Sequence, residues 1–289
     1  MTISSPLRYP GSKKKLVAYL HEILRFNEIG PNVLIEPFVG GGSVALYFLL
    51  NNIVDKIIIA DKDKLIYSFW KVLFSDPDHL INFIKKVKID LNNFYKYKEI
   101  ANNTRRHNAN KLAETCLFLN RTSFSGMLTN GAGPIGGKKQ ESEYKIDCRF
   151  NKEMLINKIK PLSLFGKRVI VLPYDWKGTM KYAEEWLERK KGLNKLLFYF
   201  DPPFYYKADQ LYRCYFNEKD HKDLCEEIIS LKHDWLLSYD NTPEIKKMYS
   251  KFRKKNMHIQ VPYSINSHAV RIEKEIIITP LKLPKISFS

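Results

Sequence analysis

The sequence predicts an α/β fold in which a mostly parallel sheet is covered by helices on both faces. An apolar strand at 33–39 (VLIEPFV) runs into three glycines, 40–42, and then into a helical stretch at 43–51. A second apolar strand, 57–60, ends on Asp61. Strand, glycine turn, helix and strand in this order are typical of the opening of a doubly wound, Rossmann-like sheet.

The other elements follow from apolar periodicity and from the residues that begin helices. Ser43 is expected to cap the helix at 43–51, and a further helix is expected at 63–74. More helices are expected at 79–100, 110–120, 179–191 and 218–231. The remaining strands are expected at 168–173, 196–200, 235–238 and 275–279, and the last ten residues, with two prolines, resemble a tail.

The chain divides into a sheet-forming part and an insertion. Residues 1–75 and 166–289 carry the strand pattern, so they are expected to form one catalytic domain. Residues 76–165 read as short helices leading into a long loop rich in Gly, Ser, Thr and Asn (TSFSGMLTNGAGPIGGKK). A loop of this length within a compact domain is usually functional, so the insertion is expected to recognise the target.

Charge favours a polyanionic partner. The 289 residues include 48 Lys and Arg against 31 Asp and Glu, a formal net charge of +17. Such a field attracts nucleic acid first and an anionic membrane surface second. A generally basic surface without a partner is the alternative.

The sequence also argues against several classes of protein. No apolar run is long enough to span a bilayer, and the start is polar and basic where a secretory signal would be apolar. An intracellular, cytoplasmic protein is expected. The four cysteines form no CxxC pair and lie near no histidine at zinc-ligand spacing, so reduced thiols and no metal site are expected.

The glycine turn predicts an adenosine-type cofactor. Gly40 and Gly42, followed by Ala45, fit the GxGxxG/A pattern, and Asp61 lies 19 residues beyond Gly42. Small residues allow the backbone to approach a ligand, and an acid at the end of the next strand can accept both ribose hydroxyls. The pattern does not separate NAD from S-adenosylmethionine, and a ligand-free turn remains possible. A Walker A loop is excluded because no GK[ST] follows.

The segment Asp201-Pro202-Pro203-Phe204 carries the strongest chemical signal. It follows the apolar run LLFYF and should therefore lie at the carboxyl end of a strand, where open α/β sheets bind ligands. The Asp201 carboxylate and the Pro202 carbonyl offer two acceptors to an NH2 group, and Phe204 offers a ring on which a base can stack. An ordinary loop is the alternative interpretation.

Two weaker motifs accompany it. Leu7-Arg8-Tyr9-Pro10-Gly11-Ser12-Lys13 is a turn with an aromatic ring and a cation, or else a basic arm. Asp175-Trp176 places an acid and a ring after the strand at 168–173, where they suit the amine and face of an adenine. A plain turn is the alternative there.

Together these motifs resemble the Dam-type DNA adenine-N6 methyltransferases. The segments LRYPGSK, IEPFVGGGSVAL, ADKD, FLNRTSFSG, FYFDPPF, LLSYDNTPEI and YSIN…EKEIII occur in that family's order, from Leu7 to about Thr279. The resemblance implies a Rossmann-like methyltransferase sheet with an inserted, mainly helical DNA-recognition domain. It implies S-adenosylmethionine as cofactor and site-specific methylation of N6 of an adenine flipped out of double-stranded DNA, as in restriction-modification.

The resemblance also implies site residues. Those expected at the cofactor are Tyr9, Lys13, Glu36, Phe38, Gly40, Gly42, Asp61, Asp175, Trp176 and Asp201. The target base is expected at Asp201, Pro202, Pro203 and Phe204, where the family usually has Tyr at the last position. Residues expected at DNA are Asn120, Arg121, Ser125, Asn130, Lys138 and Lys139. Arg and Asn can read base edges, whereas lysines suit phosphates.

One departure limits what the resemblance implies. The segment after Arg121 does not resemble the base-reading loop of the GATC-specific members, so GATC is not expected as the target. An N4-cytosine methyltransferase needs the same grip on an amine, although such enzymes commonly have Ser at the position of Asp201. The motifs also leave open an RNA adenine methyltransferase, an NAD-dependent dehydrogenase and a non-catalytic DNA-binding module. A separate cognate endonuclease is a further possible partner.

Overall fold

The computed structural model of the protein describes residues 4–9, 13, 16–191, 194–206, 208–266 and 269–284. Within 253–274 it describes the backbone only.

In this part of the chain the strands form one seven-stranded sheet in the order β3-β2-β1-β4-β5-β7-β6. The strands are β1 (Val33–Glu36), β2 (Lys56–Ala60), β3 (Val169–Leu172), β4 (Leu196–Phe200), β5 (Asp234–Asp240), β6 (Asn256–Asn266) and β7 (Ala269–Ile278). The first five pair in parallel, while β7 is antiparallel to β5 and β6 is antiparallel to β7. This mostly parallel sheet confirms the expected fold class.

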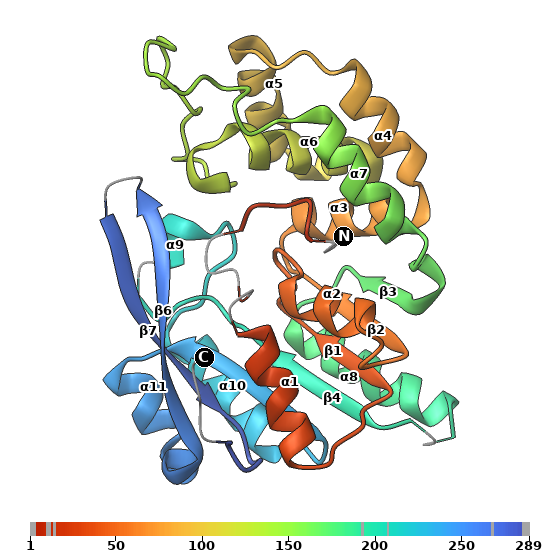
Figure 1. Ribbon diagram of the computed structural model, residues 1–289, viewed down its shortest axis with the longest axis vertical. Helices are drawn as coiled ribbons and strands as arrows, with labels where there is room; N and C mark the ends of the chain where they lie inside the picture. The colour runs from red at the N-terminus through yellow and green to blue at the C-terminus, as the bar shows by residue number, and fades with distance from the viewer. Residues whose placement is uncertain are drawn as a thin grey trace.

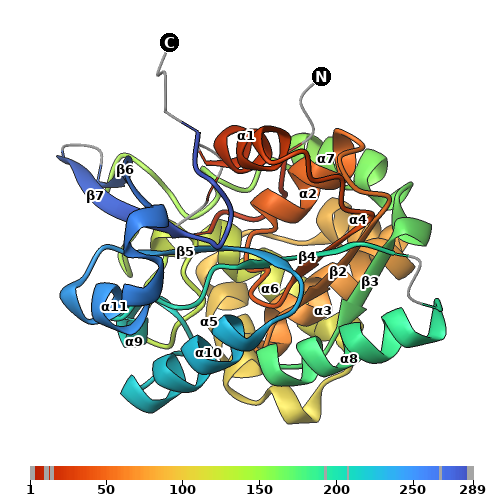
Figure 2. The ribbon, with the colours of Figure 1, turned by 90° about the horizontal axis from the view of Figure 1, so that it is seen from below.

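Helices cover both faces of the sheet (Figure 2). One face packs against α1 (Val17–Phe26), α2 (Ser43–Leu50) and α3 (Lys64–Ser75), and the other against α8 (Trp176–Arg189), α10 (Glu218–Ser230) and α11 (Pro243–Met248). The strand β4 shows why both faces are apolar. Tyr199 points into the first core, and its neighbours Phe198 and Phe200 point into the second, because successive side chains alternate between the faces.

A helical unit lies beside the sheet, in the upper part of Figure 1. It contains α4 (Pro77–Lys86), α5 (Leu91–Asn102), α6 (Ala109–Thr122) and α7 (Lys152–Ser163). Its buried side chains, such as Phe118, belong to the same core cluster as Leu34 of the sheet and Trp70 of α3. The insertion therefore extends one core of the sheet domain instead of closing a separate one.

Several elements differ from the expectation. The short helices expected over 79–100 are α4 and α5, separated because Val87 is extended and Asp90 begins α5 by accepting a hydrogen bond from the Asn93 amide (2.8 Å). The residue at the start of α2 is Gly42, in the left-handed conformation (φ 67°), and Ser43 is the first helical residue rather than the cap. The elements expected from the sequence also did not include α1, α7, α9 (Ala208–Leu211), α11 and β6. Residues 10–12 of the N-terminal motif and 285–289 of the expected tail lie outside the described residues.

Candidate active site

A pocket opens at the carboxyl ends of β1, β2 and β4, where the strand order reverses direction between β1 and β4. Open α/β sheets bind their ligands at such a switch point. Every residue expected at the cofactor lines this pocket: Tyr9, Lys13, Glu36, Phe38, Gly40, Gly42, Asp61, Asp175, Trp176 and Asp201. Pro203 lines it as well, whereas Pro202, Phe204 and all six residues expected at DNA do not.

The glycine turn is shaped for close contacts within the protein. A Cβ atom on Gly40 would lie 2.5 Å from the Tyr9 ring, and one on Gly42 would lie 2.8 Å from the Trp70 ring. Both glycines have positive φ angles, which residues other than glycine rarely adopt. The Gly40 carbonyl accepts a hydrogen bond from Trp70 Nε1 (2.9 Å). Because the Tyr9 ring packs against this turn, the N-terminal segment forms one wall of the pocket.

Asp61 is held at the end of β2 by the backbone. Its Oδ2 accepts from the Gly40 amide (3.0 Å) and its Oδ1 from the Asp63 amide (2.9 Å). Burial, with the Asp63 carboxylate nearby, raises the pKa of Asp61 to about 7 despite these two donors. Each oxygen keeps a second lone pair, so the carboxylate can still accept two hydroxyl groups from the pocket.

Glu36 closes the floor of the pocket at the end of β1. Its Oε2 accepts from the Ala45 amide in the first turn of α2 (2.8 Å). Burial raises the pKa of Glu36 well above its ordinary value, and the Asp201 carboxylate acts in the same direction. The carboxyl therefore joins the end of β1 to the helix that follows the glycine turn.

Asp201 is anchored through one of its two oxygens. Its Oδ1 contacts Lys13 Nζ (2.9 Å) and accepts from Ser238 Oγ (2.8 Å), which is itself bonded to the Tyr199 hydroxyl (2.7 Å). Lys13 Nζ also contacts Glu275 Oε1 (3.1 Å), so this buried ammonium lies between two carboxylates. Burial raises the pKa of Asp201, while Lys13 lowers it.

Asp201 and Pro202 follow β4 and carry two acceptors, of which Asp201 belongs to the pocket lining and Pro202 is buried next to it. Within the described part of the chain, neither Asp201 Oδ2 nor the Pro202 carbonyl accepts a hydrogen bond. They belong to consecutive residues at the end of β4. An NH2 group has two hydrogens to donate, so this pair matches its requirement.

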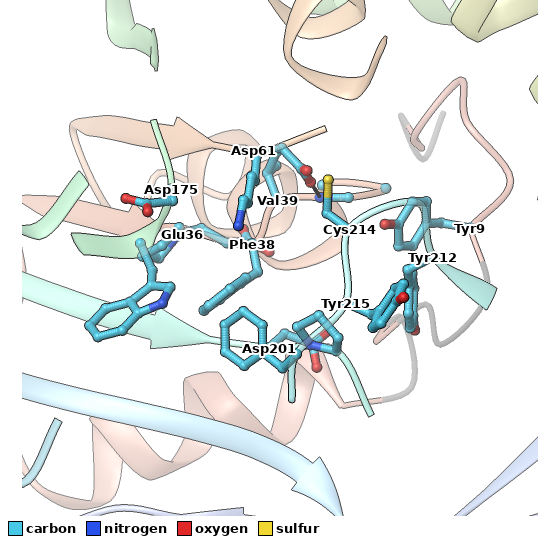
Figure 3. Close-up of a pocket in the computed structure, with 18 of the residues that line it drawn as sticks. Tyr9, Glu36, Phe38, Val39, Asp61, Asp175, Asp201, Tyr212, Cys214 and Tyr215 are labelled. Carbon is cyan, nitrogen blue, oxygen red and sulfur yellow. Dashed lines mark hydrogen bonds between the residues drawn. The ribbon is translucent and has the colours of Figure 1, made fainter. Parts of the chain in front are cut away.

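Aromatic rings gather at the Asp201 end of the pocket. The Tyr9 and Tyr212 ring centroids are 5.9 Å apart, and Phe204 lies 6.0 Å from Tyr212 in an edge-to-face arrangement. Lys13 Nζ lies 5.9 Å from the centre of the Phe204 ring. Figure 3 shows Tyr9 and Tyr212 together at one end of the pocket and Asp175 at the other.

The opposite end is also aromatic. Phe38 and Phe216 meet edge to face, with centroids 5.7 Å apart. Trp176 is almost fully buried. It packs in the core as well as lining the pocket. Asp175 begins α8, and its Oδ1 accepts from the Gly178 amide (2.9 Å). This end of the pocket therefore suits a flat apolar ring.

The structure corrects the interpretation of Asn120 and Arg121. Both side chains are buried, at 0% and 5% exposure, which is at odds with their expected contact with base edges. Asn120 Oδ1 accepts from the Arg8 amide (2.7 Å), and its Nδ2 donates to the Arg8 and Gly126 carbonyls. Arg121 Nη2 donates to the Pro6 carbonyl, and burial lowers the pKa of its guanidinium to about 10. These two residues fasten the segment before Tyr9 to α6.

The other residues expected at DNA lie in the loop after α6. Ser125, with φ 54°, sits in the short helical turn Phe124–Gly126. The Asn130 side chain is exposed, while its carbonyl accepts from Lys98 Nζ (3.0 Å). Lys138 and Lys139 are exposed. Their surfaces are available to a partner, unlike those of Asn120 and Arg121.

Several residues of the site were not predicted from the sequence. Tyr212 and Phe216 are among those that line the pocket, and Glu275 contacts Lys13 beside it. The aromatic run LYRCYF after the Asp-Pro-Pro-Phe motif was a usable signal for the first two. The sequence around Glu275 predicts a strand but no site residue, because only the folding of β7 brings Glu275 next to Lys13.

The described residues offer no metal centre and no membrane span. No group of three or more His, Cys, Asp or Glu side chains among them is arranged to hold a metal ion. Nor is any helix in the described ranges long and apolar enough to cross a membrane.

Comparison with known proteins shows a family and a relative to which the chain is similar. The family described as D12 class N6 adenine-specific DNA methyltransferase matches residues 9–265. The chain is also similar to the Type II methyltransferase M.MjaIII of Methanocaldococcus jannaschii, with 26% identity over 217 residues, which cover 71% of this chain and 70% of that protein.

Proposed function

The chain belongs to the D12 class N6 adenine-specific DNA methyltransferases, and on this basis we propose how its pocket works. Membership makes DNA the substrate and adenine N6 the methylated atom, and it requires a methyl donor. Cytosine, RNA and nicotinamide chemistry are thereby set aside. We propose that the donor is S-adenosylmethionine and that Asp201 and Pro202 hold the adenine amine.

The residues present fit S-adenosylmethionine. Asp61 has a spare lone pair on each oxygen for the two ribose hydroxyls. Phe38 and Phe216 offer ring surfaces for the adenine of the cofactor, beside Asp175. The turn at Gly40 brings backbone close to the same space. When bound, the cofactor supplies an electrophilic methyl group on a positively charged sulfur.

The amine is activated by position rather than by a covalent intermediate. The N6 lone pair of adenine is delocalised into the ring, so the amine is a poor nucleophile. Asp201 Oδ2 and the Pro202 carbonyl would accept its two hydrogens, which favours a pyramidal nitrogen with a localised lone pair. Transfer of the methyl group would form the N–C bond as the methyl–sulfur bond breaks, with S-adenosylhomocysteine as the leaving group. One amine hydrogen would leave as a proton to Asp201, whose raised pKa makes it a better proton acceptor. Orientation and electrostatics supply the rate enhancement.

Lys13 and Ser238 keep Asp201 in the right orientation for this task. Both contact Oδ1, so the carboxylate cannot rotate freely and Oδ2 stays directed to the amine. The Lys13 charge also balances the buried carboxylates Asp201 and Glu275. This one-sided anchoring of Asp201 is the observation that carries the proposal.

The target adenine must leave the DNA stack to reach this pocket, at a cost of a few kcal/mol. Phe204 and Tyr212 are placed to stack on the flipped base, which offsets part of that cost. We assign DNA recognition to the insertion, residues 76–165, with Ser125, Asn130, Lys138 and Lys139 as contacts. We also propose a separate cognate endonuclease as a partner that acts on the same DNA.

Asp201→Asn tests the catalytic assignment. The amide replaces an acceptor with a donor, so the adenine amine would face a repulsive partner. Methyl transfer to unmethylated plasmid DNA should fall at least a hundredfold, measured by incorporation of tritiated methyl groups. Calorimetric affinity for S-adenosylhomocysteine and retention of DNA in gel shifts should change less than threefold.

Glu226→Gln is the matched control, because it makes the same acid-to-amide change at an exposed position on α10. It should leave all three measurements unchanged. If Asp201→Asn keeps more than a tenth of wild-type activity, the amine is held elsewhere.

A further inference from the structure

Arg213 joins the two functional parts of the molecule. It lies in the pocket-lining segment between α9 (Ala208–Leu211) and α10, and its side chain is 19% exposed. Its Nε contacts Asp63 Oδ2 (3.3 Å), and its Nη2 donates to the carbonyl of Ala101 (2.7 Å). One guanidinium therefore touches the start of α3 and the last turn of α5.

Its first contact leads directly to the proposed cofactor acid. Asp63 begins α3, accepting from the Leu65 amide through Oδ1 (2.9 Å), and its own amide donates to Asp61 Oδ1 (2.9 Å). The residues on either side of Arg213, Tyr212 and Cys214, line the pocket. A shift of Arg213 would therefore act on the cofactor acid and on the pocket wall at the same time.

Its second contact leads to the recognition loop. Ala101 is in the last turn of α5, where carbonyls lack helical partners and a cation is favourable. One turn earlier, Lys98 Nζ donates to the carbonyls of Thr129 (2.7 Å) and Asn130 (3.0 Å) in the loop after α6. Two residues of α5 thus connect the loop to Arg213.

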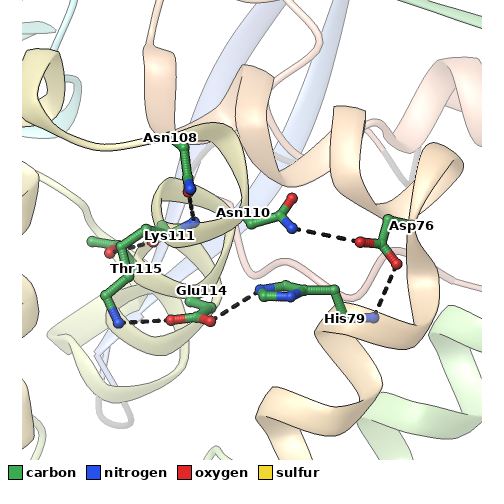
Figure 4. A network of polar contacts seen from close by, with 7 residues as sticks. All are labelled: Asp76, His79, Asn108, Asn110, Lys111, Glu114 and Thr115. Carbon is green, nitrogen blue, oxygen red and sulfur yellow. Dashed lines mark hydrogen bonds and ion pairs between the residues drawn. The ribbon is translucent and has the colours of Figure 1, made fainter.

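Polar contacts hold the helices of this unit together, so a displacement of its loop can be transmitted through them. Figure 4 shows Glu114 of α6 between Lys111 (2.7 Å) and His79 of α4 (3.0 Å). Asp76, at the start of α4, accepts from the His79 amide (3.3 Å) and from Asn110 Nδ2 (3.5 Å). α5 packs against α6 in turn.

We propose that Arg213 is a positioning residue that couples DNA binding by the helical unit to cofactor binding in the pocket. DNA bound at the loop acts on α5 through Lys98, and Arg213 transmits the effect to Asp63 and to the segment at Tyr212. Cofactor and DNA then bind more tightly together than apart. The proposal rests on the proposed use of the pocket for the cofactor.

The test is a thermodynamic cycle. We would measure the dissociation constant of S-adenosylhomocysteine by calorimetry, with and without saturating unmethylated plasmid fragments. In the wild type, DNA should tighten this constant about fivefold or more, and S-adenosylhomocysteine should tighten DNA binding by the same factor, since coupling is reciprocal. Arg213→Met should bring the factor close to one, and Arg213→Lys, which keeps the charge, should retain part of it.

Arg168→Met is the matched control. Arg168 also joins separate segments, donating to Asp55, Val54 and Asn52, but at the amino end of β2, away from the pocket. It should leave the coupling factor at the wild-type value even if it lowers the melting temperature.

Three outcomes would overturn the coupling proposal: a wild-type factor of one, an undiminished factor in Arg213→Met, or an equal loss in Arg168→Met. The cofactor assignment itself is checked separately with Asp61→Ala, whose S-adenosylhomocysteine affinity is measured without DNA. An unchanged affinity there would refute the proposed function of the pocket, whatever Arg213 does.

Discussion

At the scale of single residues, the site is a set of carboxylates whose oxygens are already partly occupied. Asp61 has both oxygens held by amides, whereas Asp201 has only Oδ1 held. This difference suits their proposed roles. A ribose needs a fixed pair of acceptors, while an amine needs one acceptor kept open beside a backbone carbonyl.

The raised pKa of Asp61, about 7, predicts a pH dependence of cofactor binding. Only the ionised carboxylate offers acceptors on both oxygens, so S-adenosylhomocysteine should bind about tenfold more tightly at pH 8 than at pH 6, by one-proton linkage. Calorimetry at a series of pH values measures this. Asp61→Asn should bind more weakly with no such dependence, and a retained dependence in this variant would assign it to another group.

The raised pKa of Asp61 also makes the stability of the ligand-free protein depend on pH. The folded state binds the Asp61 proton more tightly than the unfolded chain, in which the carboxyl has an ordinary pKa. Asp61 therefore stabilises the folded state at a pH below the ordinary pKa of Asp, and this stabilisation is lost as the pH rises toward 7.

At the scale of elements, the N-terminal segment is built into the site by α6. Asn120 near the end of α6 holds the Arg8 backbone, and Tyr9 follows immediately against the glycine turn. The pocket wall thus depends on a contact between residues 112 positions apart. This arrangement gives Asn120 a positioning role, distinct from base reading.

Asn120→Ala distinguishes these two roles. Loss of its buried hydrogen bonds should cost about 1 to 3 kcal/mol. This cost lowers kcat/KM by about 5- to 150-fold, while the methylated sequence stays the same. Initial rates of tritiated-methyl incorporation measure kcat/KM, and single-molecule sequencing of DNA from a methylation-deficient host that expresses the variant reports the methylated sequence. Asn130→Ala, at an exposed position on the loop, is the comparison and should alter sequence preference instead. A changed target sequence in Asn120→Ala would restore the base-reading interpretation.

At the scale of the whole molecule, the net charge of +17 suits a DNA substrate. The structure exposes Lys138 and Lys139 on the recognition loop, while Arg121 is turned inward. Phosphate contacts are therefore expected from the loop, and they should not depend on sequence.

Lys138→Ala combined with Lys139→Ala should weaken binding to every DNA sequence alike. The slope of log affinity against log salt should become shallower by about 2, since each phosphate contact contributes about 0.9. Fluorescence anisotropy over a salt series measures the slope. Lys222→Ala, which removes an exposed lysine on α10 paired with Glu218, is the control and should keep the wild-type slope. An unaltered slope in the double variant would exclude these two lysines from the phosphate contacts.

Local sequence patterns were enough to predict the parallel strands, the glycine turn with Asp61, and the Asp-Pro-Pro-Phe segment. A buried strand shows as an apolar run, and a ligand turn shows as glycines between a strand and a helix. The residues expected at the cofactor that follow β1 to β4 line one pocket because parallel strands bring their carboxyl ends to the same edge, whereas Tyr9 reaches it through the contact of Arg8 with α6.

Long-range packing was needed to establish that Asn120 and Arg121 point inward, that Glu275 meets Lys13, and that Arg213 joins α5 to Asp63. Each of these contacts joins residues far apart in the chain, whose pairing leaves no periodic mark on either segment. An Asn or Arg near a helix end reads the same whether it faces DNA or the backbone of a distant loop. Burial settles the choice, since a buried polar group must find its partner inside the fold.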